Sequence, residues 1–176
     1  LALELLQLIP TYRLEDVYSG SIAFSLGEFN FRGELGYFDQ REDENFFQYA
    51  AGIDREWSGI LRLDDSLYWL IQYADDVVTK HRDPSSISFF DFRRVLDNCI
   101  TTKVSYSLDA TKEWTIKIEG AVNLGESDVY IEPALIWRKR SVEFELGFDI
   151  MAGNRDTFWG GYRDNDRIYS KLTYKF

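Results

Sequence analysis

Apolar and polar residues alternate along most of this chain, and the alternation is clearest near its C-terminal end. From residue 166 onward, one set of alternate positions is mostly apolar or aromatic and the other is mostly charged. The first set is Ile168, Ser170, Leu172, Tyr174 and Phe176, and the second is Arg167, Tyr169, Lys171, Thr173 and Lys175. Successive side chains of a β-strand point to opposite faces, so this segment is predicted to be a strand with one apolar and one charged face.

The same period of two recurs upstream and predicts nine strands from residue 16 onward. The apolar positions of the eight earlier strands include Ile22, Leu35, Ala51, Ile71, Val104, Ile118, Leu135 and Leu146. At about ten residues each, tilted strands are long enough to cross an apolar layer of about 25 Å. Residues 1–9 break the alternation at Leu6, so they are predicted to form a short helix or loop ended by Pro10, with the tail of a tenth strand as the alternative.

The predicted connections between strands differ in length at the two edges of the sheet. One edge receives mostly short connections, near Gly27, Gly59, Ala110 and Lys139. The opposite edge receives residues 40–45, 77–96, 125–128 and 152–165, which include the two longest connections. Short turns at one edge and longer loops at the other are the asymmetry expected of a membrane β-barrel.

The composition supports a single β-rich domain over residues 1–176 and narrows the classes of partner. Aromatic residues make up 16% of the chain and only three residues are proline, a balance that suits strands. A net charge of −10 argues against nucleic acid, whose phosphates need a basic surface. With Cys99 and His81 as the single residues of their types, an internal disulfide framework and a Cys/His zinc cluster are excluded.

The C-terminal region resembles known membrane proteins. The alternating terminal strand with its final Phe176 resembles the C-terminal signature of Gram-negative outer-membrane β-barrels. Residues 91–98 and 152–166 are similar to the C-terminal halves of large porin-like barrels of an uncharacterised proteobacterial family. The resemblance implies an all-β, antiparallel up-and-down transmembrane β-barrel, with nine or ten strands in this chain and the chain as the C-terminal part of a larger barrel.

The same resemblance carries expectations about location and partners. It implies the bacterial outer membrane, contact with lipid and lipopolysaccharide, and recognition of the C-terminal strand by the barrel-assembly machinery through Tyr174 and Phe176. The chain begins at Leu1 without a Met, which fits a removed export signal or an excised fragment. The resemblance implies no catalytic residue.

The charged alternate positions would line the interior of such a barrel. They are Arg32, Glu34, Lys103, Lys117, Glu119, Glu132, Glu143, Glu145, Asp149, Arg167 and Lys171. A water-filled pore lined by charges of both signs selects small hydrophilic solutes by pore diameter and by the electrostatic field. We therefore expect a porin-like channel for passive diffusion. Two alternatives stay open: a salt-bridged interior that plugs a structural barrel, and a soluble lipocalin-like barrel that binds a small apolar ligand.

The sequence contains no pattern for catalysis. Ser105 and Ser170 have no nearby His with a supporting acid, so we expect neither an enzyme nor a cofactor. The acidic pairs at residues 64–65 and 75–76 are predicted to lie at strand ends, where such pairs are more often solubilising than acid/base groups. Both pairs are therefore interpreted as surface charges.

Loop acids and strand-end aromatics complete the set of candidates. Residues 39–44 and 164–166 offer oxygen ligands for calcium, but neither follows the EF-hand pattern, so no metal site is expected. Aromatic residues near strand ends are expected to anchor at a membrane interface. They are Tyr37, Tyr49, Trp57, Trp69, Tyr73, Trp114, Trp137, Tyr174 and Phe176.

Overall fold

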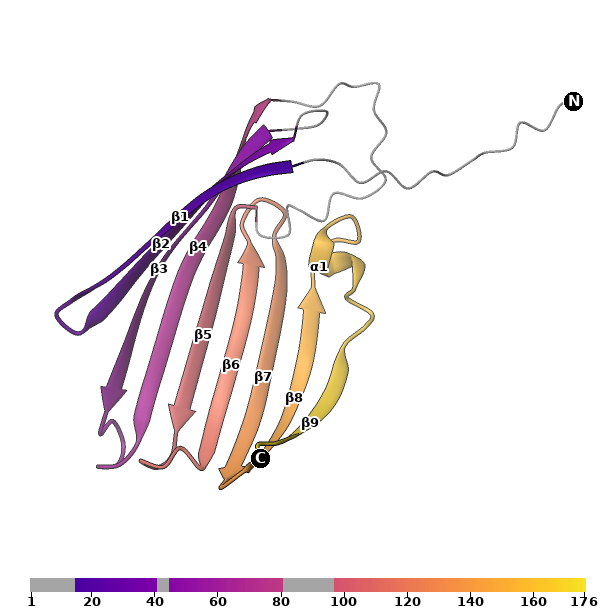
Figure 1. Ribbon diagram of the computed structural model, residues 1–176. Helices are drawn as coiled ribbons and strands as arrows, with labels where there is room; N and C mark the ends of the chain where they lie inside the picture. The colour runs from indigo at the N-terminus through magenta and orange to yellow at the C-terminus, as the bar shows by residue number, and fades with distance from the viewer. Residues whose placement is uncertain (1–14, 41–44, 81–96) are drawn as a thin grey trace, which may run out of the picture.

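The computed structural model describes residues 15–40, 45–80 and 97–176. Its strands form one nine-stranded antiparallel sheet in which each strand pairs with the next along the chain (Figure 1). The strands are β1 (Glu15–Leu26), β2 (Phe29–Gln40), β3 (Asn45–Ser58), β4 (Ser66–Lys80), β5 (Cys99–Ser107), β6 (Trp114–Asn123), β7 (Asp128–Lys139), β8 (Val142–Ala152) and β9 (Arg167–Tyr174). The prediction of nine strands is confirmed, and residues 1–9 lie outside the described part of the chain.

The sheet is not closed into a barrel. β1 and β9 are its two edges, and they do not pair with each other among the described residues. In an antiparallel meander of nine strands, the first and the last run in the same direction. Direct closure would therefore pair β1 and β9 in parallel, unlike the neighbouring pairs at either edge. Of the predicted barrel, the structure contains the all-β antiparallel up-and-down meander.

The two ends of the sheet carry different connections. The turns predicted near Gly27, Gly59, Ala110 and Lys139 all lie at the end that holds the C-terminus (Figure 1). Gly27 and Gly59 have φ values of 63° and 71°, a left-handed conformation that favours glycine. At the other end, the connection between β8 and β9 contains the short helix α1 (Phe158–Gly161). In the described ranges, no helix is long and apolar enough to cross a membrane.

β4 is longer than the sequence predicted. It continues to Lys80, so the prediction that a loop begins at Val77 is wrong. Val77 and the next residue pair across the ladder with Phe47 and Phe46 of β3. Contacts between β-branched and aromatic side chains stabilise neighbouring strands, which explains why the ladder extends past the acidic residues 75–76.

The two faces of the sheet carry different side chains. Ile118 of β6 lies between Val104 and Pro133 on one face, which we call the apolar face. The next residue, Glu119, lies on the opposite face, which we call the polar face. The apolar face is the more exposed: Ile118 is 44% exposed, whereas Glu145 on the polar face is only 8% exposed. Exposed apolar residues also recur along β8 and β9, namely Phe144, Leu146, Phe148, Ile150, Ile168 and Leu172.

Candidate functional site: the polar face of the sheet

Every charged residue that the sequence predicted to line an interior lies on the polar face. Those on β5–β9 are neighbours in the ladder and are Lys103, Lys117, Glu119, Glu132, Glu143, Glu145, Asp149, Arg167 and Lys171. Arg32 and Glu34 lie apart from them on β2. The structure therefore places the predicted set on one face of one sheet, and its role as a pore wall stays a prediction.

Lys117 is the centre of the charged cluster on β5–β9. Its Nζ lies 2.9 Å from Glu145 Oε1, 3.0 Å from Glu132 Oε1 and 3.3 Å from Glu119 Oε2. The Lys117 side chain is only 12% exposed. Glu119 also lies 2.6 Å from Lys103 Nζ. Because desolvation of an ammonium group is costly, this buried cation depends on the carboxylates around it.

Two tyrosines that sequence reasoning missed belong to the same cluster. The Tyr169 hydroxyl lies 2.6 Å from Glu132 Oε1 and 3.0 Å from Glu145 Oε1. The Tyr130 hydroxyl lies 2.8 Å from Glu132 Oε2 and 2.6 Å from Asp149 Oδ1. Both tyrosines occupy alternate positions of the polar face, so the period of two is the signal that could have identified them.

Gly147 makes the position of Tyr169 possible. The two residues are partners across β8 and β9, and a Cβ at Gly147 would lie 2.5 Å from the Tyr169 hydroxyl. The ring therefore lies over the glycine backbone, an arrangement that fixes register between strands. Beside it, Asp149 pairs with Arg167. We call the connected group the charged belt: Lys103, Lys117, Glu119, Tyr130, Glu132, Glu145, Asp149, Arg167 and Tyr169.

The connection between β8 and β9, which the sequence predicted as one of the two longest, folds onto the polar face. The Trp159 ring stacks on Tyr130 with ring centres 4.8 Å apart. The Trp159 backbone N–H donates to Asp128 Oδ2 at 2.6 Å, and Asp128 is completely buried. Gly160 is also buried, and a Cβ there would lie 1.8 Å from the Asn154 carbonyl oxygen. This loop is therefore tightly packed beside the charged belt.

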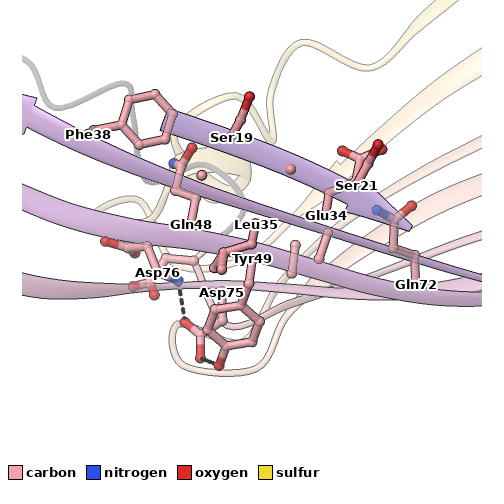
Figure 2. Close-up of a pocket in the computed structure, with 15 residues that line it drawn as sticks. Ser19, Ser21, Glu34, Leu35, Phe38, Gln48, Tyr49, Gln72, Asp75 and Asp76 are labelled. Atoms are coloured by element: carbon pink, nitrogen blue, oxygen red, sulfur yellow. Dashed lines mark hydrogen bonds between the residues drawn. The ribbon is translucent and has the colours of Figure 1, made fainter. Parts of the chain in front are cut away.

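The half of the polar face formed by β1–β4 is less filled than the half that carries the belt. A cavity of about 910 Å³ opens over these strands (Figure 2). Arg32, beside it on β2, pairs with Asp54. The floor of the cavity includes the small residues Ala50 and Ala74, which leave space above the backbone.

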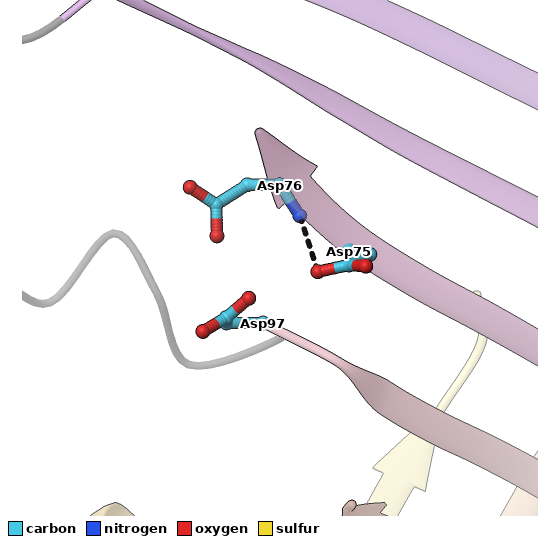
Figure 3. Close-up of side chains that lie close together, drawn as sticks. All are labelled: Asp75, Asp76 and Asp97. Carbon is cyan, nitrogen blue, oxygen red and sulfur yellow. Dashed lines mark hydrogen bonds between the residues drawn. The ribbon is translucent and has the colours of Figure 1, made fainter. Parts of the chain in front are cut away.

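Three carboxylates gather beside β4: Asp75 and Asp76, which the sequence analysis interpreted as surface charges, and Asp97, which it did not connect with them. Asp75, Asp76 and Asp97 bring one oxygen each within 4.8 Å of one another (Figure 3). Burial and hydrogen bonds to the other two carboxylates raise the pKa of Asp97 to about 6. Asp75 lies within β4 rather than at its end and accepts hydrogen bonds from Tyr49 and Tyr73 at 3.0 and 2.8 Å. Oxygen groups of this kind suit a hard divalent cation, and they also occur without one.

The other acidic candidates have ordinary structural roles. Asp166 accepts a hydrogen bond from the Met151 backbone N–H at 2.9 Å, and Asp164 lies 3.9 Å from Arg155. Residues 41–44 and His81 lie outside the described part of the chain. The expectations that the chain holds no metal and performs no catalysis stay predictions.

Aromatic side chains form two rows on the apolar face, one near each end of the strands. The row near the turns includes the pair Trp114–Trp137, with ring centres 6.4 Å apart. The opposite row includes Tyr18–Tyr37 at 6.5 Å, Tyr37–Phe47 at 4.7 Å and Tyr49–Tyr73 at 6.3 Å. Between the rows lie aliphatic residues such as Ile118. The predicted aromatics on the strands lie on this face, in these rows or close to them.

Comparison with known proteins adds no relative. A scan against protein-family models finds no match, and searches of curated proteins and of solved structures find no similar chain. The geometry of the sheet is thus the basis on which a function can be argued.

Proposed function

We propose that the nine strands form part of the wall of a β-barrel in a bacterial outer membrane. The apolar face would contact lipid, and the polar face would border a water-filled interior through which small hydrophilic solutes diffuse. Lipopolysaccharide and the barrel-assembly machinery are the partners that such a location implies. The proposal rests on one observation: apolar side chains on one face of the sheet are exposed, whereas charged side chains on the other face are buried.

In a soluble sheet, apolar side chains pack into the core and charged side chains face water. Here Ile116, Leu135 and Phe148 are 45%, 41% and 44% exposed, whereas Glu145 and Asp149 are 8% and 2% exposed. A continuous apolar surface of this kind needs a covering partner. Lipid is the partner that fits a band of aliphatic residues between two aromatic rows, because aromatic rings with polar edges favour both interfaces of a bilayer.

The two open edges support a barrel larger than these nine strands. A sheet edge exposed to hydrocarbon leaves backbone groups without hydrogen bonds, so a spanning sheet must close. Since β1 and β9 run in the same direction, closure by antiparallel pairs alone requires an odd number of further strands. An even total is the usual number in bacterial barrels.

A plugged structural barrel is the second candidate, and a specific observation favours it. The charged belt pairs most of its charges internally, and Trp159 holds a loop against the polar face. Both features fill space that a solute would use. The soluble lipocalin-like alternative is less favoured, because such a barrel binds its apolar ligand on a buried apolar face.

Refolding separates the membrane proposal from the soluble alternative. Because the proposed barrel needs further strands to close, the test uses the protein that carries these nine strands together with those strands. It is refolded with and without detergent micelles and compared by circular dichroism and gel filtration. We expect monodisperse, β-rich protein only with micelles, and a folded monomer in plain buffer would contradict the membrane proposal. Conductance in planar bilayers then separates the two barrels, because a plugged barrel inserts without ion current.

A further inference from the structure

The cavity over β1–β4 has a lining that differs from the charged belt. Its polar side chains come from four neighbouring strands: Ser19, Ser21, Glu34, Gln48, Gln72 and Asp76 (Figure 2). The lining also includes Asp75 and Asp97, so hydroxyl and amide groups accompany four carboxylates. No Lys or Arg lines the cavity among the described residues, so its field is negative.

Glu34 is the carboxylate best placed to meet a ligand. It is exposed on β2, opposite Ser21, and its side chain has no hydrogen-bond or ion-pair partner in the described part of the chain. The nearby cation Arg32 pairs with Asp54 instead. A carboxylate without a partner, at the wall of a cavity, can accept a cation without first breaking an internal ion pair.

Phe38 adds an aromatic surface to this otherwise polar lining. Its ring stacks on Phe46 with ring centres 4.7 Å apart and planes 8° from parallel. The ring also lies back over Gly36, where a Cβ would be 3.0 Å from Phe38 Cε2. Aromatic faces attract ammonium groups and cover short apolar stems.

We propose that this cavity binds a small organic cation that carries an ammonium group on a short apolar stem. Glu34 would pair with the ammonium charge, Gln72 would accept or donate hydrogen bonds, and Phe38 would contact the stem. The inference rests on the proposed channel function, within which the cavity is a binding site for the permeating solute.

Calorimetric titration of the same closed barrel in detergent micelles tests the proposal with 1,4-diaminobutane, 1,4-butanediol and succinate. We expect the diamine to bind and the neutral and anionic analogues not to bind. Glu34→Gln should weaken diamine binding about fivefold, the factor expected for one partly exposed ion pair. Glu126→Gln, an exposed acid in the turn before β7, is the matched control and should bind as the wild type does.

Equal diamine affinity in the wild type and Glu34→Gln, or butanediol binding as tight as the diamine, would overturn the assignment. Phe38→Leu gives a second measure and should weaken binding about threefold. Conductance of the same preparations keeps the two proposals apart. A conducting chain that does not bind the diamine refutes the cation site alone, and a diamine-binding chain without conductance refutes the channel alone.

Discussion

At the scale of single residues, Lys117 holds the charged belt together. It contacts Glu119, Glu132 and Glu145 within 3.3 Å, so its removal leaves three carboxylates close together without their shared cation. We expect Lys117→Met to lower the free energy of unfolding by about 3–5 kcal/mol, the usual cost of breaking a buried ion pair from one side. The measurement is the urea midpoint in micelles, followed by tryptophan fluorescence. The exposed Lys171 supplies the control, and equal midpoints for Lys117→Met and Lys171→Met would contradict the central role.

Asp65 organises the turn between β3 and β4. Its carboxylate accepts hydrogen bonds from the backbone N–H groups of Ile60, Leu61 and Arg62 at 2.6, 2.8 and 2.9 Å. Burial raises the pKa of Asp65, but the Tyr106 hydroxyl and these N–H groups outweigh it and lower the pKa to about 2. The sequence-based interpretation of this acid as a solubilising surface charge is therefore wrong, because Asp65 is 2% exposed.

The lowered pKa of Asp65 gives a pH dependence with a definite sign. The folded pKa lies below the ordinary value of 3.8, so ionised Asp65 stabilises the fold fully above about pH 4, and this contribution is lost as the pH falls toward 2. We expect the urea midpoint of the wild type to fall more steeply between pH 5 and pH 2 than that of Asp65→Asn. Asp64→Asn should keep the wild-type slope, and identical slopes in all three proteins would refute this role for Asp65.

At the scale of elements, alternation in the sequence predicts the strands. It does not predict that the connection between β8 and β9 folds onto the polar face. Alternation placed Ile118 and Glu119 on opposite faces because strand geometry alone decides it. The contact between Trp159 and Tyr130 joins residues of β7 and α1 that no local pattern connects. Tyr130 was missed for a related reason. Aromatic residues near strand ends were interpreted as interface anchors, and the face of the sheet on which each one lies was not considered.

The packing of the connection between β8 and β9 against the polar face leads to a prediction about conductance. Trp159→Ala removes the stack on Tyr130 and should release the loop from the polar face, so single-channel conductance should rise in planar bilayers. Arg155→Ala changes an exposed residue of the same loop and serves as the control. If Trp159→Ala conducts as the wild type does, the loop does not narrow the path.

The C-terminal strand makes a second prediction at this scale. Phe176 follows β9 and is fully exposed among the described residues, so its removal should break little of the described packing. Phe176→Ala should therefore slow membrane assembly in cells while leaving detergent refolding unchanged. Phe24→Ala, an exposed aromatic of β1, should assemble at the normal rate. Normal assembly of Phe176→Ala would remove Phe176 as an assembly signal.

At the scale of the whole molecule, alternation predicts which side chains share a face but not how the sheet closes. The antiparallel order follows from short connections such as the turn at Gly27, which cannot cross between parallel strands. Closure depends on what pairs with β1 and β9, and no residue within either strand specifies that partner. The exposed Ile168 and Leu172 of β9 show only that its apolar face needs a cover.

The nature of the medium that covers the apolar face can be tested by placing an arginine at two depths along the strands and comparing the loss of stability. Ile118 lies near the middle of β6 and Val142 at the turn end of β8, both on the apolar face. An arginine at the centre of a bilayer costs about 2–4 kcal/mol and near an interface about 0–1 kcal/mol, whereas an exposed position in water is insensitive to depth. Ile118→Arg should therefore lower the free energy of unfolding in lipid bilayers by at least about 2 kcal/mol more than Val142→Arg. Equal effects of the two substitutions would mean that water or protein, and not lipid, meets this face.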